Sequence, residues 1–207
     1  EIPAAVSSLG ESVFYDSGFS EIVFAGDLIT EIPDHTFAYC ASLTSVTLPQ
    51  SITAIGDSAF SYCEGLAAVS LPDGVTGIGE RAFSGCESLS GISLPGSVTS
   101  IGDDAFADCT GLVTAGPAGG GYDYEFGWTD AIPAYAFSGC ESMLSAVLPE
   151  SVTEIGDHAF SGCYDIVSVN IPAGVKRIGE SAFSDCYELT GISLPDGLTV
   201  IGSRAFM

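Results

Sequence analysis

The stretch Leu43–Cys63, LTSVTLPQSITAIGDSAFSYC, decides the fold, because variants of it recur along almost the whole chain. The register is set by a phenylalanine that returns every 23 residues, with a single spacing of 31. Its positions are Phe37, Phe60, Phe83, Phe106, Phe137, Phe160, Phe183 and Phe206. Such a period is typical of solenoids, in which each unit buries its apolar face only by stacking on its neighbours.

The unit reads as a strand, a corner and a return across the core. Residues 46–48 alternate as expected of a short strand with one buried face, and Pro49 ends it because proline has no N–H to donate. Gly56 permits a bend after a second apolar segment, residues 52–55. Asp57 is expected to begin a short helical turn, and Phe60 and Cys63 then point inward.

The charge of the chain excludes some partners. It carries 4 Lys and Arg against 27 Asp and Glu, a net charge of −23, while 46% of its residues are apolar. A surface of this sign opposes binding to nucleic acid and to anionic lipid. No apolar run is long enough to insert into a membrane. A solvated acidic surface, a cationic partner and divalent metal ions remain open.

The unit LxxVxLPxxIxxIGxxAFxxC resembles the BspA-like, Treponema-type leucine-rich repeat over about residues 23–207. The resemblance implies an α/β-type leucine-rich-repeat solenoid, a right-handed superhelix of about eight 23-residue coils with parallel strands and short helical turns. It also implies no catalytic centre, no cofactor, and a role in adhesion for surface or secreted proteins of host-associated bacteria. In such folds the LxxVxL strands line the concave sheet.

Two segments depart from the repeat. Residues 1–22 are expected to form an N-terminal cap or an irregular partial repeat, with a hairpin over the first coil. The array, residues 23–207, holds an irregular insert at 113–131, which reads VTAGPAGGGYDYEFGWTD from Val113 to Asp130. The chain ends within a repeat and shows no signal peptide, so we expect it to be part of a longer protein.

The insert is the first candidate binding site. If this segment is extended, its four alternating aromatic residues share one face. They are Tyr122, Tyr124, Phe126 and Trp128. Aromatic side chains near glycines suit a binding loop, and they also suit a loop that packs on the solenoid.

The concave face is the second candidate. The outward strand positions there are small and polar, at Thr47, Ser70, Ser93, Asn170 and Ser193. Such a face allows close approach of a partner but lacks the Trp, Tyr and Arg that usually dominate binding energy.

The seven cysteines and the acidic residues have plain structural interpretations. Each cysteine follows a repeat phenylalanine by three residues, which favours buried free thiols over disulfides, and the lack of a CxxC pair opposes a metal site. Acidic residues follow the repeat glycine at Asp57, Glu80, Asp103, Asp157 and Glu180. Capping of turns explains them individually, and calcium binding between coils is the alternative that stays open.

Enzyme motifs are missing from the sequence, and its two histidines, His35 and His158, lie in distant repeats. We therefore expect a non-enzymatic, extracellular or cell-surface bacterial module that binds a protein partner, such as a host matrix or cell-surface protein, through the solenoid face and the insert. One alternative is a structural spacer or stalk in a larger surface protein. Another is a carbohydrate-binding module that stacks glycans on the aromatic insert.

Overall fold

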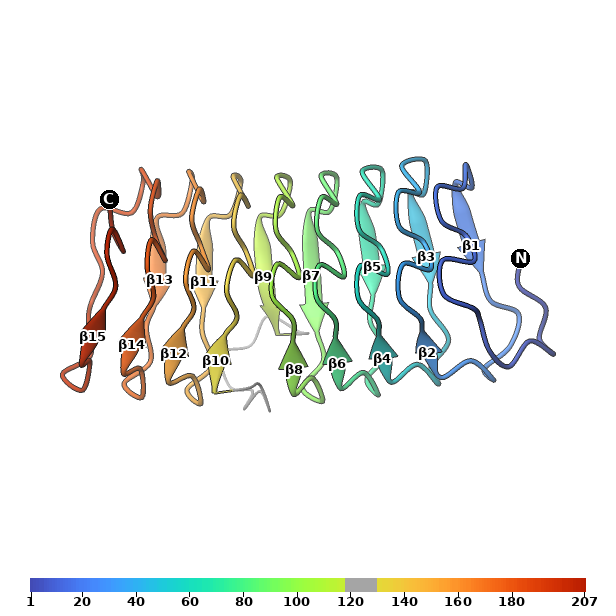
Figure 1. Cartoon of the computed structure of the whole chain (residues 1–207), viewed down its shortest axis with the longest axis horizontal. Coiled ribbons are helices and arrows are strands. Elements are labelled where there is room, and N and C mark those ends of the chain that lie inside the picture. The colour runs from blue at the N-terminus through green and yellow to red at the C-terminus, as the bar shows by residue number, and fades with distance from the viewer. Residues whose placement is uncertain (118–129) are drawn as a thin grey trace.

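The computed structural model describes residues 1–117 and 130–207. At residues 114–117 it describes the main chain only. The coils stack side by side into an elongated solenoid with the two termini at opposite ends (Figure 1). Residues 23 apart face each other in neighbouring parallel strands, as Val46 and Val69 do. The predicted leucine-rich-repeat solenoid is confirmed.

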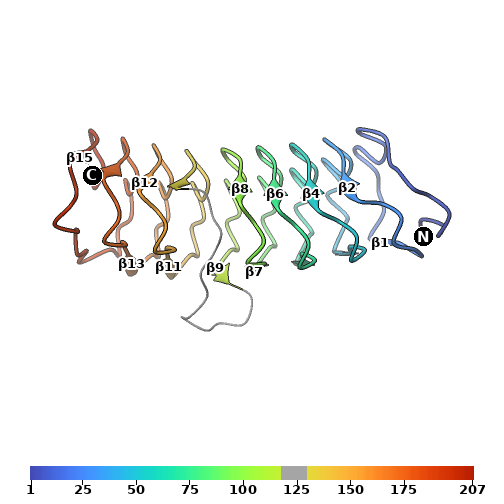
Figure 2. The same ribbon diagram turned by 90° about the horizontal axis from the view of Figure 1, so that it is seen from below.

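Two rows of strands run along the solenoid. One row contains the five-stranded sheet β1 (Glu21–Val23), β3 (Ser45–Thr47), β5 (Ala68–Ser70), β7 (Gly91–Leu94) and β9 (Thr114–Pro117), and then the pair β11 (Ser145–Val147) and β13 (Ser168–Asn170). The other row contains β2 (Glu31–Ile32), β4 (Ala54–Ile55), β6 (Gly77–Ile78) and β8 (Ser100–Ile101), and then β10 (Ala131–Ile132), β12 (Glu154–Ile155), β14 (Arg177–Ile178) and β15 (Val200–Ile201). Figure 2 shows the two rows on opposite sides of the coils.

The repeat phenylalanines form the spine of the core. Phe60 and Phe83 are fully buried, and their ring centroids lie 5.3 Å apart at an interplanar angle of 2°. The same stacking continues to Phe206 at the last coil. Strand residues alternate around this spine, so Val46 is buried between exposed neighbours.

The predicted helical turns are wrong for the described residues, which contain no helix. Ser58 and Tyr62, which flank Phe60 by two residues on each side, have positive φ values of 54° and 57°. Left-handed residues at this spacing interrupt any helix. The main-chain N–H of Phe60 instead donates to Ala82 of the next coil at 2.8 Å. Hydrogen bonds between coils thus replace hydrogen bonds within a helix.

The repeat glycine is required for close approach between coils, and not for the bend that the sequence suggested. A Cβ atom placed on Gly79 would lie 2.5 Å from Oδ1 of Asp57 and 2.6 Å from its nitrogen. Real side chains essentially never make contacts this short, so the coils with glycine at this point present bare main chain to the coil before, while Pro33 and Pro133 take the equivalent position in two other coils.

The N-terminal segment does not form the expected hairpin. The strand pairings of its described residues are parallel, from the bridge between Ile2 and Phe24 to the pairing of β1 with β3. Phe14 lies 23 residues before Phe37 and stacks on it at 5.4 Å, so this segment extends the phenylalanine spine. Phe19 then stands edge-on to Phe14 at 6.0 Å and covers the end of the spine.

The core passes across the long repeat without a break. Phe106 and Phe137 are 31 residues apart in sequence, and their rings still stack at 5.5 Å. The main-chain N–H of Phe106 donates to Ala136 at 2.9 Å, as in every regular coil. The longer repeat therefore leaves the spacing of the phenylalanine spine as it is in the regular coils.

Candidate functional site

The cysteine column is a structural feature of the described chain. All seven cysteines are free, and each thiol donates to the main-chain carbonyl of the phenylalanine one coil earlier, as Cys63 does to Phe37 at 3.1 Å. Burial raises the pKa of the Cys63 thiol to about 12, because the thiolate would lose its hydration. A buried, protonated thiol is a poor nucleophile and a poor metal ligand.

The acidic column also bonds to the main chain. Oδ1 of Asp57 accepts the N–H of Glu80 at 2.8 Å, and Oδ1 of Asp157 accepts that of Glu180 at 2.8 Å. This bond, together with the guanidinium of Arg177, lowers the pKa of Asp157. Within residues 1–117 and 130–207 there is no group of three or more His, Cys, Asp or Glu side chains that could hold a metal ion.

The predicted small polar positions lie on the outside of the solenoid. Thr47, Ser70, Ser93 and Asn170 are exposed in strands β3, β5, β7 and β13. Ser193 is also exposed but lies in a segment without strand pairing. Their use as a binding face stays a prediction. The predicted aromatic site of the insert, at Tyr122, Tyr124, Phe126 and Trp128, lies outside the described residues.

An apolar pair interrupts the polar surface in the C-terminal half. Leu144 and Val167 directly precede β11 and β13, and their exposed fractions are 49% and 51%. They lie in adjacent coils, since the N–H of Val167 donates to the carbonyl of Leu144 at 3.0 Å. Val147, at the end of β11, is 43% exposed. The adjoining exposed side chains of Leu144 and Val167 make this surface a candidate interaction site.

Sequence reasoning also missed a row of adjoining surface tyrosines, which we call the tyrosine ridge: Tyr15, Tyr39 and Tyr62. The rings of Tyr39 and Tyr62 are stacked, and the ring of Tyr15 is tilted by 48° to that of Tyr39. The ring centroids of Tyr15 and Tyr39 are 5.3 Å apart, and those of Tyr39 and Tyr62 are 4.9 Å apart. Each of the three residues is between 40% and 48% exposed. Tyr39 and Tyr62 each follow a repeat phenylalanine by two residues, which was a readable signal.

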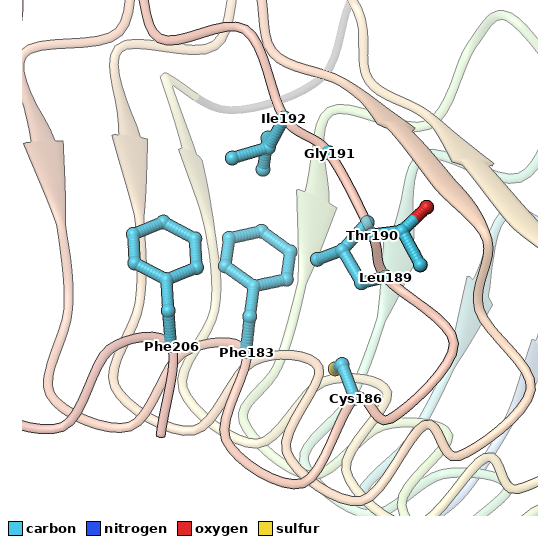
Figure 3. A pocket seen from close by; sticks show the side chains of 7 residues that line it. All are labelled: Phe183, Cys186, Leu189, Thr190, Gly191, Ile192 and Phe206. Atoms are coloured by element: carbon cyan, nitrogen blue, oxygen red, sulfur yellow. The ribbon is translucent and has the colours of Figure 1, made fainter.

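A pocket opens at the C-terminal end of the solenoid (Figure 3). Phe183 and Phe206 stand side by side on one wall, with Cys186 beside them and Leu189 and Ile192 opposite. These side chains are the continuation of the core, and the only side-chain polar groups in the lining are the thiol and the Thr190 hydroxyl. The pocket therefore offers no acid–base pair for catalysis.

Comparison with known proteins agrees with this architecture. The chain matches the family described as BspA type Leucine rich repeat region in six copies, over residues 1–113 and 129–207. No curated protein matches it. Within the described part of the chain, no helix is long and apolar enough to cross a membrane.

Three solved structures illustrate the similarity. A leucine-rich-repeat protein of Treponema pallidum is 34% identical, with a TM-score of 0.57, and the match covers 84% of this chain and 67% of that one. A leucine-rich cell surface protein of Faecalibacterium prausnitzii is 29% identical, with a TM-score of 0.57 and coverage of 89% and 60%. The pneumococcal vaccine antigen PcpA shares the fold at 23% identity, with a TM-score of 0.68 and coverage of 97% and 57%.

Proposed function

This chain belongs to the BspA-type leucine-rich-repeat family, and on that premise we propose that it is a non-enzymatic protein-interaction module of a bacterial surface or secreted protein. Leucine-rich-repeat proteins generally mediate protein interactions and are generally not enzymes. The similar Faecalibacterium protein is a leucine-rich cell surface protein, which supports this location. A host matrix or cell-surface protein is the partner class that such a location favours.

The apolar pair Leu144 and Val167 carries this proposal. Both side chains are about half exposed in adjacent coils, on a chain whose surface is otherwise strongly acidic. Since each side chain is already about half buried, its burial against a partner contributes about half of the 1.5–3 kcal/mol of full burial, whereas exposure gives the free protein no benefit. A spacer would not need apolar side chains at this position.

A panel of purified host matrix proteins, probed beside a glycan array, tests the proposal. We expect the protein to bind at least one matrix protein, and Leu144→Asp with Val167→Asp to abolish that binding. Leu28→Asp is the matched control, because Leu28 is 55% exposed and lies far along the array. Binding to neither the matrix proteins nor the glycans would favour the spacer. Binding to glycans alone would favour a carbohydrate-binding module.

A further inference from the structure

We propose that the tyrosine ridge, Tyr15, Tyr39 and Tyr62, is a docking surface for an extended protein segment rich in arginine and lysine. The inference rests on the proposed interaction function and names the chemistry of one partner. The three rings come from three successive coils and are arranged in a row before any partner binds. Such preorganised side chains lose little conformational freedom on binding.

The main chain holds two of these rings in an unfavourable conformation. Tyr39 and Tyr62 have φ values of 63° and 57°, in the left-handed region that bulky residues avoid. The equivalent position of the later coils is taken by glycine at Gly85, Gly139 and Gly162, or by aspartate. A tyrosine is therefore not needed for the turn itself, and its presence calls for another role.

The neighbouring coil is shaped to accommodate the ridge. The ring of Tyr62 lies over Gly85, where an added Cβ atom would be 2.6 Å from Cδ1 of the ring. The faces of the Tyr39 and Tyr62 rings thus turn toward each other, and the Tyr62 ring also covers bare main chain, which leaves ring edges at the surface. A partner would contact these edges with long aliphatic stems, and arginine and lysine carry such stems behind their charged groups.

The charges around the ridge select a cationic partner. Residues 1–80 contain no lysine or arginine. Asp16 is next to Tyr15 in sequence, Glu64 lies two residues after Tyr62, and both carboxylates are exposed. Guanidinium groups can donate to these carboxylates while their stems lie along the rings. Nucleic acid and anionic membranes are disfavoured by the same charges.

The basic residues of the chain itself do not compete for this surface. Arg81 pairs with Glu80 at 2.7 Å, and Arg177 pairs with Asp157 at 2.9 Å. Lys176 and Arg204 belong to the last two coils. The acidic surface around the ridge is therefore left for a partner.

A fluorescent oligoarginine peptide at physiological salt is the probe that tests this inference. We expect the wild-type protein to bind it, and Tyr39→Gly combined with Tyr62→Gly to weaken binding by about tenfold or more. Glycine fits both left-handed positions, so the variant should keep its thermal midpoint. Asp16→Asn with Glu64→Gln should also weaken binding and reduce its dependence on salt.

Tyr135→Gly is the matched control for the ridge variant. Tyr135 has a φ of 56°, is 40% exposed and stacks on His158 at 4.6 Å. It precedes a repeat phenylalanine by two residues, whereas Tyr39 and Tyr62 follow one by two residues. We expect this variant to bind the peptide as the wild type does. Equal losses in both variants, or no loss in the ridge variant, would mean that acidity alone holds the peptide, and would overturn the inference.

The failure of this inference is distinguishable from failure of the proposed function. If the wild-type protein does not bind oligoarginine but still binds a matrix protein through Leu144 and Val167, the ridge proposal falls and the interaction function stands. If oligoarginine binds through the ridge and no matrix protein binds, the apolar pair is not an interaction site. The ridge then remains as a docking surface for a cationic segment.

Discussion

The thiol of Cys86 donates a hydrogen bond to the main-chain carbonyl of Phe60, one coil earlier, with an Sγ–O distance of 3.2 Å. The same carbonyl accepts the N–H of Cys63 within its own coil at 3.2 Å. Each cysteine of the column therefore links its own coil to the preceding coil, at a point that lies outside both rows of strands. The thiol is both a small apolar side chain and a donor for a buried acceptor.

Replacement of Cys86 by alanine removes that donor and leaves a small cavity. We expect Cys86→Ala to lower the free energy of unfolding by about 1–2 kcal/mol, measured by urea denaturation. Cys86→Ser keeps a donor and should cost less. A serine variant less stable than the alanine variant would show that packing of the sulfur, and not the hydrogen bond, governs this position.

The phenylalanine spine should be most sensitive at its centre. Phe83 is fully buried between Phe60 and Phe106, so Phe83→Ala should cost about 3–5 kcal/mol of unfolding free energy. Phe206 is 41% exposed and has one stacked neighbour, and Phe206→Ala should cost far less. Thermal denaturation of the two variants measures the difference, and similar midpoints would contradict it.

The glycine column predicts a contrast between two alanine variants. Gly79→Ala places a methyl group against Asp57 and the preceding main chain, and we expect a loss of about 1–3 kcal/mol in unfolding free energy. Gly96→Ala meets no atom within 4 Å and should leave stability unchanged or slightly raised. Equal stability of the two variants in urea would refute the close-approach explanation.

The buried thiols predict a loss of stability in alkali. Burial raises the pKa of Cys63 and of Cys109 from the ordinary 9.0 to about 12 in the folded chain. Below pH 9 both folded and unfolded chains keep these protons, so this contribution is fully present. As pH rises from about 9 toward about 12, only the unfolded chain ionises, and the free energy of unfolding falls.

Urea titrations at a series of pH values measure this dependence. The double variant Cys63→Ser with Cys109→Ser should lose less stability between neutral and alkaline pH than the wild type. Tyrosine ionisation is common to both proteins and cancels in the comparison. Parallel curves for the two proteins would assign the alkaline loss to groups other than the thiols.

The core was predictable because its residues repeat in phase. Phe60 and Cys63 recur with their neighbours at a fixed spacing, and stacking of identical coils places them in columns. The same logic could have extended the spine to Phe14, which lies 23 residues before Phe37. It was obscured because Val13 and Ser17 replace the usual alanine and cysteine.

The turn geometry was not predictable from the same pattern. The left-handed position two residues before each phenylalanine is held by residues such as His35, Ser58 and Arg81, and none of them signals a positive φ. Hydrogen bonds between coils, such as Phe37 to Ala59 at 2.8 Å, determine this backbone and override local preference. A single coil in isolation carries no such information.

The tyrosine ridge could be predicted from the sequence only in part. Tyr39 and Tyr62 are in phase with the repeat and could be read as a column. Tyr15 stands one position out of phase, and only the fold shows that its ring meets Tyr39 at 5.3 Å. The exposed pair Leu144 and Val167 was likewise hidden, since apolar residues beside a strand are usually assigned to the core.

The stacking of Phe106 on Phe137 across the longest repeat has a consequence for engineering. The distance between the two rings is the same there as in a regular coil, so eight added residues between the two strand rows leave the spacing of the core unchanged. Loop closure costs grow only slowly with length, so any regular coil should accept a guest peptide at the same place. Grafting between Gly96 and Ser97 would turn this solenoid into a display scaffold with sites at a fixed spacing along one edge.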